Sequence, residues 1–475
     1  MADNHYICTV MRYKLLTVTL FLLLTGGGAL RAQAVVSVDP AAVRGAVKPM
    51  NAGNNGPTDM TMESYEALRV PYARTHDTPL GMAYGGHCID INLVFPDFSA
   101  NVNSPKSYDF TNSDVVLLDM QKAGTKPFYR LGQSIEHQTK KYGIYPPRDY
   151  KKWAKICEHI IRHYNEGWAD GFHFNIQYWE VWNEPNLEWD NDRWKVDPRC
   201  WAGSPEEFYD FFEVAVKHLK GCFPDLLIGG PAMSGTDPGV RTVPVWYELL
   251  LSEMKKRNVP LDFFAWHIYE ADPTVYVDYS YQVRALLDKY GYNNAESFLN
   301  EWNYIKSWTD DYPYSMRTLP SAKAAAFVCA AMQEGQNCPT DMMMYYDWRP
   351  CSFNGLFDPL SDTPIWGYWA IYAWGKLKTL GTQVKASCDI PDVRVTAARG
   401  ADGKLGILVS RYVMDDNITS VQNVTVRLDG GKFDEKVRCH ITDPFSMYTE
   451  YPVALQPDGT LLLELQPDSF VYIEF

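Results

Sequence analysis

Positive charge is scarce in this chain and forms no cluster. The 44 Lys and Arg residues are outnumbered by 58 Asp and Glu, which gives a formal net charge of −14 and a pI of about 5.2. No Lys- or Arg-rich run occurs. Because affinity for nucleic acids is built from basic side chains that neutralise phosphates, the sequence argues against a polyanionic partner. A neutral or weakly charged substrate is easier to accommodate.

The cysteines include no C-x-x-C pair, which argues against a zinc site. Cys8 lies in an N-terminal segment that we expect to be removed, so nine of the ten cysteines remain in the mature chain. An odd number cannot all pair. The disulfide pairing therefore stays open, and we expect most of these residues to be buried thiols.

The N-terminal apolar run is too short for a membrane-spanning helix, which needs about 20 residues. This run, Leu15 to Leu24, follows Arg12 and Lys14 and precedes the small-residue site Ala32-Gln33-Ala34. The pattern predicts a secretory signal peptide over residues 1–34. Since the residue directly after the cleavage site is not Cys, a lipid anchor is not expected. We therefore expect an exported protein, periplasmic or extracellular, with no membrane span after signal removal.

The chain is long enough for a large barrel and one accessory domain. Between residues 48 and 381, short apolar runs alternate with longer amphipathic segments, which is typical of parallel strands joined by helices. The expected strands are Met50 to Asn54, Tyr72 to His76, Pro127 to Leu131, Ile176 to Trp182, Leu226 to Gly230, Phe263 to Ile268, Phe298 to Asn300 and Met342 to Tyr346. The expected helices include Tyr150 to Tyr164, Pro205 to Leu219, Val245 to Lys256 and Ala322 to Gln333. Eight such units predict an α/β fold, a (β/α)8 TIM barrel, with catalytic side chains at the C-terminal ends of its strands.

After residue 382 the pattern changes to short alternating runs. Examples are Val393 to Thr396, Gly406 to Val409, Val424 to Leu428 and Leu461 to Leu465, which are separated by Asp-Gly turns. This predicts a C-terminal β-sandwich domain over residues 382–475, and residues 35–47 are a candidate for one more of its strands. No repeat, low-complexity tract or flexible linker occurs, so we expect the sandwich to be docked rigidly on the barrel.

Two glutamates stand where apolar segments of the predicted barrel end. Glu184 follows the aromatic-rich run Tyr178 to Trp182, and Pro185 makes continued strand pairing unfavourable there. Glu301 follows the run Ser297 to Asn300 in the same way. The two side chains would end the fourth and seventh barrel strands, at the same mouth of the barrel.

Two carboxylates at one barrel mouth match the requirements of glycosidic bond cleavage. One protonates the leaving oxygen, and the other attacks or stabilises an oxocarbenium-like centre. Carboxyl groups about 5 to 5.5 Å apart retain the anomeric configuration, and the fourth and seventh strand ends can approach that closely. The aromatic content of 14% agrees with surfaces for sugar rings. We therefore predict a retaining glycosidase that needs no metal or organic cofactor.

The run Trp179-Glu180-Val181-Trp182-Asn183-Glu184-Pro185-Asn186 resembles the fourth-strand signature of the large (β/α)8 retaining glycosidase clan. It is most similar to that of glycoside hydrolase family 39, which contains β-xylosidases and α-L-iduronidases. The segment Leu299-Asn300-Glu301-Trp302 resembles the seventh-strand site, although it is shorter and less specific. The resemblance implies that Glu184 is the acid/base and Glu301 the nucleophile.

The resemblance also implies that three residues near the second and fourth strands bind substrate. Arg74 and His76 look like the family's Arg-x-His, in which the His can hydrogen-bond a sugar hydroxyl. The alternative for Arg74 is an ion pair with a buried carboxylate such as Glu180. Asn183 resembles the amide that contacts the 2-hydroxyl of the sugar.

The ends of the sixth and eighth strands supply the remaining candidates. His267 and Tyr269 look like the family's His-x-Tyr: Tyr269 would donate to the nucleophile, and His267 would either bind substrate or support the acid. Trp348 is predicted to stack on the sugar, the alternative being a Trp packed in the barrel rim. The segments Tyr84 to His87 and Gln133 to His137 match no family motif, and are either substrate contacts or loop packing.

The sugar itself stays open. Family frequency favours exo-acting cleavage of β-xylosides or related plant-type oligosaccharides. An α-L-iduronidase would want a basic side chain near the sugar carboxylate, for which Arg349 is a candidate. A β-glucosidase, an α-L-arabinofuranosidase and an endo-glycanase are further alternatives. A noncatalytic glycan-binding protein is disfavoured because both carboxylates are present. The oligomeric state cannot be predicted from the sequence.

Overall fold

The computed structural model describes residues 34–78 and 86–475. The predicted signal peptide therefore lies outside the described residues, except for Ala34, and so do Tyr84 and Gly85. Within the described part of the chain, no helix is long and apolar enough to cross a membrane. The nine cysteines of this part are free thiols, most of them buried.

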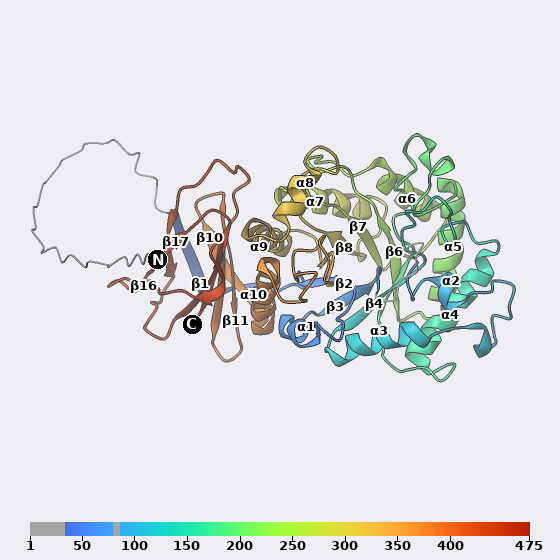
Figure 1. The fold of residues 1–475 in the computed structure, drawn as a ribbon, viewed down its shortest axis with the longest axis horizontal. Helices are drawn as coiled ribbons and strands as arrows, with labels where there is room; N and C mark the ends of the chain where they lie inside the picture. Colours follow the sequence, from blue (N-terminus) through green and yellow to red (C-terminus); the bar gives the residue numbers. More distant parts are fainter. Residues whose placement is uncertain (1–33, 79–85) are drawn as a thin grey trace, which may run out of the picture. The chain divides into compact units, whose positions relative to one another are not determined.

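Eight parallel strands close into a barrel in the order of the sequence (Figure 1). They are β2 (Ala52–Asn54), β3 (Tyr72–Thr75), β4 (Lys126–Leu131), β5 (Tyr178–Val181), β6 (Leu227–Met233), β7 (Phe263–His267), β8 (Glu296–Trp302) and β9 (Met342–Tyr345). The last strand pairs with the first, which closes the barrel. Each expected strand overlaps an observed one, and the predicted TIM barrel is confirmed.

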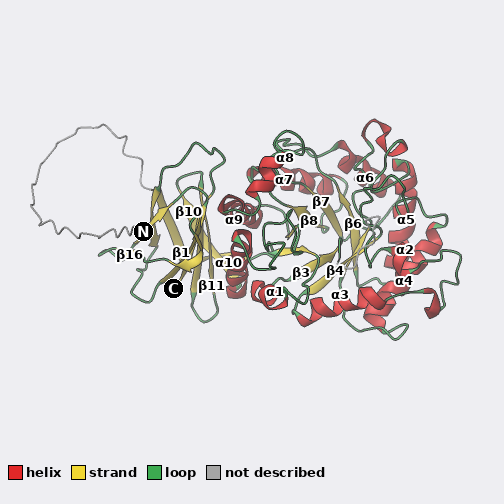
Figure 2. Ribbon diagram, viewed as in Figure 1, coloured by secondary structure: helices red, strands yellow, loops and turns green. Residues whose placement is uncertain are grey.

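Helices surround the barrel strands (Figure 2). They are α1 (Met62–Leu68), α2 (Ile91–Val94), α3 (Thr111–Lys122), α4 (Tyr150–Glu166), α5 (Pro205–Cys222), α6 (Val245–Lys256), α7 (Thr274–Lys289), α8 (Tyr312–Thr318), α9 (Ala322–Asn337) and α10 (Trp366–Leu380), with the short segments η1 (Pro105–Ser107) and η2 (Asp190–Lys195). Local sequence sets the start of α5: Ser204 caps the helix, Pro205 is its first residue, and Glu207 completes a capping box with Ser204.

Large apolar side chains fill the lower part of the barrel interior. Phe128, Tyr178, Phe263 and Phe298 are buried together there, with ring centroids 5.2 to 5.8 Å apart. They come from the first halves of their strands. The polar residues that follow them along the strands therefore collect above this layer, at the C-terminal mouth, as the fold requires.

The C-terminal region forms a curled, mainly antiparallel sheet of ten strands. Its C-terminal strands are β10 (Thr382–Cys388), β11 (Val393–Arg399), β12 (Leu405–Arg411), β13 (Gln422–Leu428), β14 (Arg438–Asp443), β15 (Ser446–Glu450), β16 (Ala454–Leu455), β17 (Leu461–Leu465) and β18 (Ser469–Glu474). The early strand β1 (Ala34–Ala46) pairs with β10 and β13, and so belongs to this sheet. Gln333 of α9 donates to the Leu408 carbonyl of β12 at 2.9 Å. The predicted fold class, a barrel followed by a β domain, is confirmed.

Candidate active site

Glu184 lies just beyond β5, where the backbone leaves the strand in an unusual conformation. Trp182 and Glu184 both have positive φ, 77° and 44°, a region that residues other than Gly rarely adopt. The Glu184 amide donates to the Ala232 carbonyl at 2.9 Å, which holds this turn against the end of β6. The Glu184 side chain is 13% exposed. The turn thus directs a nearly buried carboxyl into the barrel mouth.

Glu301, on β8, is held by two donors. The Arg74 Nη1 lies 2.7 Å from Oε1, and the Tyr269 hydroxyl lies 3.0 Å from Oε2. The residue is only 5% exposed. Hydrogen bonds that a carboxylate accepts from a guanidinium and a hydroxyl favour its ionised form. These two donors oppose the effect of burial on Glu301, and its role as the nucleophile stays a prediction.

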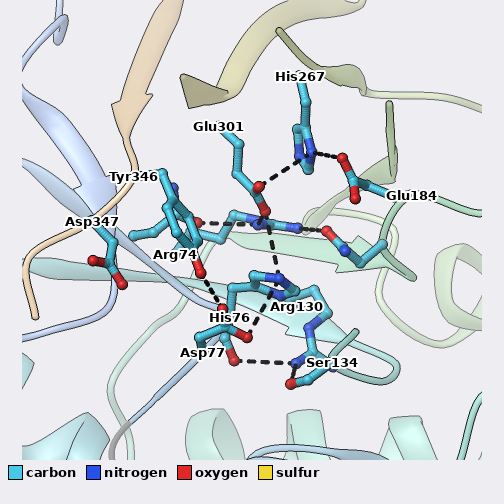
Figure 3. A network of polar contacts seen from close by, with 12 residues as sticks. Arg74, His76, Asp77, Arg130, Ser134, Glu184, His267, Glu301, Tyr346 and Asp347 are labelled. Atoms are coloured by element: carbon cyan, nitrogen blue, oxygen red, sulfur yellow. Dashed lines mark hydrogen bonds and ion pairs between the residues drawn. The ribbon is translucent and has the colours of Figure 1, made fainter. Parts of the chain in front are cut away.

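His267 lies between the two glutamates (Figure 3). Its Nδ1 is 2.9 Å from Glu184 Oε1 and 3.5 Å from Glu301 Oε2. One oxygen of each glutamate and a ring nitrogen of His267 lie within 4.8 Å of one another. This short spacing fits retaining cleavage, since inverting enzymes separate the two carboxyl groups by about 6.5 to 9.5 Å.

Burial and neighbouring charges set the protonation of these groups. Burial raises the pKa of Glu184 to about 7, although Arg199 and Arg74 oppose the shift. Burial also raises the pKa of Glu301, opposed by His267 and Arg74. The pKa of His267 is lowered to about 4, chiefly by burial, so the ring is neutral at neutral pH. A neutral imidazole can donate to ionised Glu184 or accept from the protonated acid, depending on its tautomer.

Arg74 connects the site residues to one another. Besides Glu301, its guanidinium contacts Glu180 at 2.6 Å, Asn183 Oδ1 at 2.6 Å and Asn54 Oδ1 at 3.0 Å. All of these contacts are buried. The alternative for Arg74, an ion pair with Glu180, is therefore what the structure shows, together with a contact to the candidate nucleophile. Direct binding of substrate by Arg74 stays a prediction.

A second polar network begins at His76, just beyond β3 (Figure 3). The His76 Nε2 lies 3.5 Å from Glu301 Oε1 and 3.6 Å from Asp77 Oδ1. Tyr346 donates its hydroxyl to Asp77 Oδ2. Arg349 contacts Asp347 at 2.5 Å and Asp77 at 3.5 Å. The sequence reasoning named His76 and Arg349, but not Asp77, Tyr346 or Asp347.

The position of Trp348 corrects the prediction that it stacks on the sugar. Its side chain is 1% exposed, with the ring directly above Gly53 and edge-on to Tyr65 at 5.8 Å. No ring face is left for a ligand. The aromatic residue of this segment that borders the site is Tyr346, whose ring lies 6.4 Å from both His76 and Tyr269.

The loop after β5 adds neighbours of Glu184 that the sequence reasoning missed. Cys200 is buried, with its Sγ 4.0 Å from Glu184 Oε2. Arg199 pairs with the buried Glu188 at 2.7 Å and its charge lowers the pKa of Glu184. The loop sequence carries no periodic pattern, and neither Arg199 nor Cys200 belongs to a motif that would single it out.

Two groups of described side chains have a spacing that would permit a metal ion: Glu184 with His267 and Glu301, and Glu158 with His218 and Cys222. In each group a carboxylate already has a basic partner. Arg74 lies 2.7 Å from Glu301, and Lys155 lies 2.7 Å from Glu158. Independence from metals stays a prediction.

Comparison with known proteins supports the assignment of the chain to a glycosidase family. The family model for glycosyl hydrolases family 39 matches residues 85–351, more than half of the chain and a segment that contains both Glu184 and Glu301. A β-xylosidase of Caldicellulosiruptor saccharolyticus is 29% identical over 176 residues, 35% of this chain and 32% of the relative. A β-xylosidase of Geobacillus stearothermophilus is 26% identical over 285 residues, 54% of this chain and 50% of the relative. The chain thus spans half the length, or less, of these curated relatives.

The fold also matches a solved structure over nearly its whole length. A glucosidase from Croceicoccus marinus superposes with a TM-score of 0.74 at 20% identity, covering 93% of this chain and 98% of that one. At this identity the likeness concerns the fold. The family model and the fold together confirm the resemblance that the Glu184 and Glu301 motifs indicate: the chain belongs to glycosyl hydrolases family 39.

Proposed function

We propose that the protein is a retaining, exo-acting glycosidase that removes a neutral terminal sugar, with a β-xyloside as the favoured substrate. The observation that carries the proposal is the pair Glu184 and Glu301, with one oxygen of each within 4.8 Å and His267 between them. The names of the two β-xylosidase relatives support the choice of sugar.

The two glutamates divide the chemistry. Glu301 attacks the anomeric carbon while Glu184 gives its proton to the departing oxygen, and a covalent glycosyl-enzyme forms. Glu184, now a carboxylate, then takes a proton from water. That water attacks the anomeric carbon, releases the sugar with its configuration retained and restores Glu301. Asn183 uses its Oδ1 to accept from Arg74, which leaves its NH2 group to donate to the 2-hydroxyl of the sugar.

The charge around Arg349 favours a neutral sugar over a uronide. The guanidinium is paired with Asp347 at 2.5 Å and lies 3.5 Å from Asp77, and both carboxylates are buried. One positive charge against two negative charges leaves this end of the site negative. A sugar carboxylate placed here would be repelled. The iduronidase alternative therefore loses its candidate basic residue.

Aromatic rings at the barrel mouth support carbohydrate binding. Trp308, in the loop after β8, is 41% exposed. It lies 5.2 Å from Tyr269 and is stacked on Phe353 at 6.2 Å. Exposed aromatic faces beside a catalytic pair suit the C–H surfaces of sugar rings. The noncatalytic alternative would keep these rings but show no turnover.

The test is a panel of aryl glycosides that contains a β-xyloside, a β-glucoside, an α-L-arabinofuranoside and an iduronide. We expect aglycone release, fastest from the β-xyloside, and proton NMR should show β-xylose as the first product formed. Release of α-xylose first would contradict retention. No release from any sugar would favour the glycan-binding alternative.

We predict an alkaline limb near pH 7 in the profile of kcat/KM. Glu184 must be protonated to assist departure of the leaving group, and its pKa is about 7, so the rate should fall as pH rises above that value. With a dinitrophenyl glycoside, whose leaving group needs no proton, the limb should weaken. Glu184→Gln should lose the limb altogether with that substrate.

Glu270→Gln is the matched control for this profile. Burial raises the pKa of Glu270 to about 7 as well, but its carboxylate accepts from the Gly239 amide at 2.6 Å instead of contacting the glutamate pair. We expect this variant to keep the alkaline limb. Loss of the limb in Glu270→Gln, or its persistence in Glu184→Gln, would show that another group titrates.

Export is part of the proposal, supported by the signal-like pattern of residues 1–34. Expression of the full chain in a bacterial host, followed by N-terminal sequencing of the protein recovered outside the cytoplasm, tests it. We expect the mature protein to begin at Val35. A protein that stays uncleaved in the cytoplasm would contradict this.

A further inference from the structure

Asp77 is a buried carboxylate next to the site, and among the described residues only one of its two oxygens accepts a hydrogen bond. The residue follows His76 just beyond β3 and is 7% exposed. Its Oδ2 accepts from the Tyr346 hydroxyl and lies 3.5 Å from Arg349 Nη2. Its Oδ1 has no hydrogen-bond partner among the described residues.

The groups nearest to this free oxygen are too distant for good hydrogen bonds. His76 Nε2 lies at 3.6 Å and His87 Nε2 at 3.5 Å from Asp77 Oδ1. Burial alone would raise the pKa of Asp77, but His76, Arg349 and the Tyr346 hydroxyl hold it below its ordinary value. The side chain is therefore ionised. A buried carboxylate oxygen without a partner is costly, and such atoms normally meet a donor.

A structural role for Asp77 does not account for the free oxygen. Arg349 already has a closer partner in Asp347, at 2.5 Å against 3.5 Å for Asp77. The hydroxyl of Tyr346 engages Oδ2, not Oδ1. Within residues 34–78 and 86–475, the contacts of this network thus leave Oδ1 without a hydrogen bond.

A chain of contacts connects Glu184 to Asp77 (Figure 3). It runs from Glu184 to His267 at 2.9 Å, to Glu301 at 3.5 Å, to His76 at 3.5 Å and to Asp77 at 3.6 Å. Glu184 marks the scissile oxygen and Glu301 the anomeric carbon. Asp77 therefore lies where the cleaved sugar presents hydroxyls remote from the scissile bond.

We propose that Asp77 is a specificity-determining residue, whose free Oδ1 accepts a hydrogen bond from a sugar hydroxyl remote from the anomeric carbon. This inference rests on the proposed function and deepens it. The substrate must carry a free hydroxyl at that position, because an ionised carboxylate can only accept. A substituent on that hydroxyl removes the donor and meets buried side chains, so the sugar bound here is a chain end.

The experiment compares one parent aryl glycoside, chosen as the best substrate of the panel, with analogues that each lack or O-methylate one remote hydroxyl. For wild type we expect kcat/KM to fall by about 100-fold or more for one deoxy analogue, because a buried acceptor is then left unpaired. The O-methyl analogue of the same position should be at least as poor.

In Asp77→Asn and Asp77→Ala the penalty for that analogue should shrink by about tenfold or more, since the charged acceptor is gone. Asp347→Asn is the matched control. It also removes a buried carboxylate that pairs with Arg349, but we expect it to keep the wild-type ratio between parent and deoxy analogue. This ratio separates recognition from a general loss of folding, which thermal unfolding of each variant monitors.

Two results would overturn the role of Asp77 alone: wild type that cleaves all remote-deoxy analogues as well as the parent, or Asp77 variants that keep the wild-type ratio. The wild-type series decides the matter even where a variant does not fold. Wild type that cleaves no glycoside would instead overturn the proposed function, and the role of Asp77 with it.

Discussion

Glu301→Ala should lower kcat by about 10⁴-fold or more on an aryl β-xyloside, because the first step loses its nucleophile. The variant keeps Glu184 and its neighbours, so binding should suffer much less than turnover. Added azide should enter the space left by the carboxylate and restore release of the aglycone. The product of that rescue should be the α-glycosyl azide, with inverted configuration, which proton NMR identifies.

Glu296→Gln is the matched control for this experiment. Glu296 begins the same strand, β8, and is half-buried, but it lies at the other end of the barrel, where Tyr178 donates to it at 2.9 Å. We expect it to retain near wild-type turnover and to show no response to azide. Unimpaired activity in Glu301→Ala, or azide rescue without inversion, would remove Glu301 from the nucleophile's role.

The barrel could be predicted because its signals are local. Each parallel strand is an apolar run that is buried on both faces, and each helix has its own pattern and caps, as at Ser204 before α5. The glutamates follow from the same logic: Glu184 and Glu301 stand directly after apolar runs, and in a barrel such positions share one mouth. The distances between them required the structure.

Asp77, Tyr346 and Arg349 could not be predicted as a unit, because their contacts are not local. The hydrogen bond between Asp77 and Tyr346 joins residues 269 positions apart. Both residues sit just past the ends of strands, in segments with no periodic pattern. Sequence reasoning could see that basic and acidic residues occur there, but not that Asp347 and Asp77 both face Arg349.

The failure at Trp348 has a specific physical cause. In a continuing strand, Tyr346 and Trp348 would point to the same side. The strand β9 ends at Tyr345, however, and the Trp348 amide then donates to the Asn54 carbonyl at 3.1 Å. This turn brings the indole down over Gly53, while Tyr346 stays beside the site. The prediction that Trp348 stacks on the sugar was therefore wrong.

Arg74→Met should be the most damaging single change outside the two glutamates. The substitution leaves Glu180 and Glu301 buried without their cation, and breaking a buried ion pair costs about 3 to 5 kcal/mol of unfolding free energy. It also releases Asn183 and Glu301 from their common anchor. Misplacement of reacting groups alone can cost about 100-fold in rate, so we expect kcat to fall at least that far.

The pH dependence of stability distinguishes this explanation from simple loss of packing. Arg74 lowers the pKa of Glu301, so in Arg74→Met that pKa should rise further above its value in the unfolded chain. A carboxyl group whose pKa is raised by folding ionises more readily in the unfolded chain, so the fold loses stability as the pH rises through that range. The free energy of unfolding of Arg74→Met should therefore fall below that of wild type by a small amount near pH 4 and by a larger amount towards pH 7. Urea unfolding at both pH values measures it.

Two further variants complete the test of Arg74. Arg74→Met with Glu180→Gln should regain part of the stability at pH 7, because one uncompensated charge is gone. It should regain none of the activity, because Glu301 still lacks the guanidinium that contacts its Oε1. Arg130→Met is the matched control: Arg130 is equally buried on the next strand and pairs with Asp90 at 2.7 Å. Its loss should cost stability, while the pH profile of kcat/KM should keep its alkaline limb. An Arg74→Met deficit that does not change with pH would mean that the guanidinium acts there through packing and not through its charge.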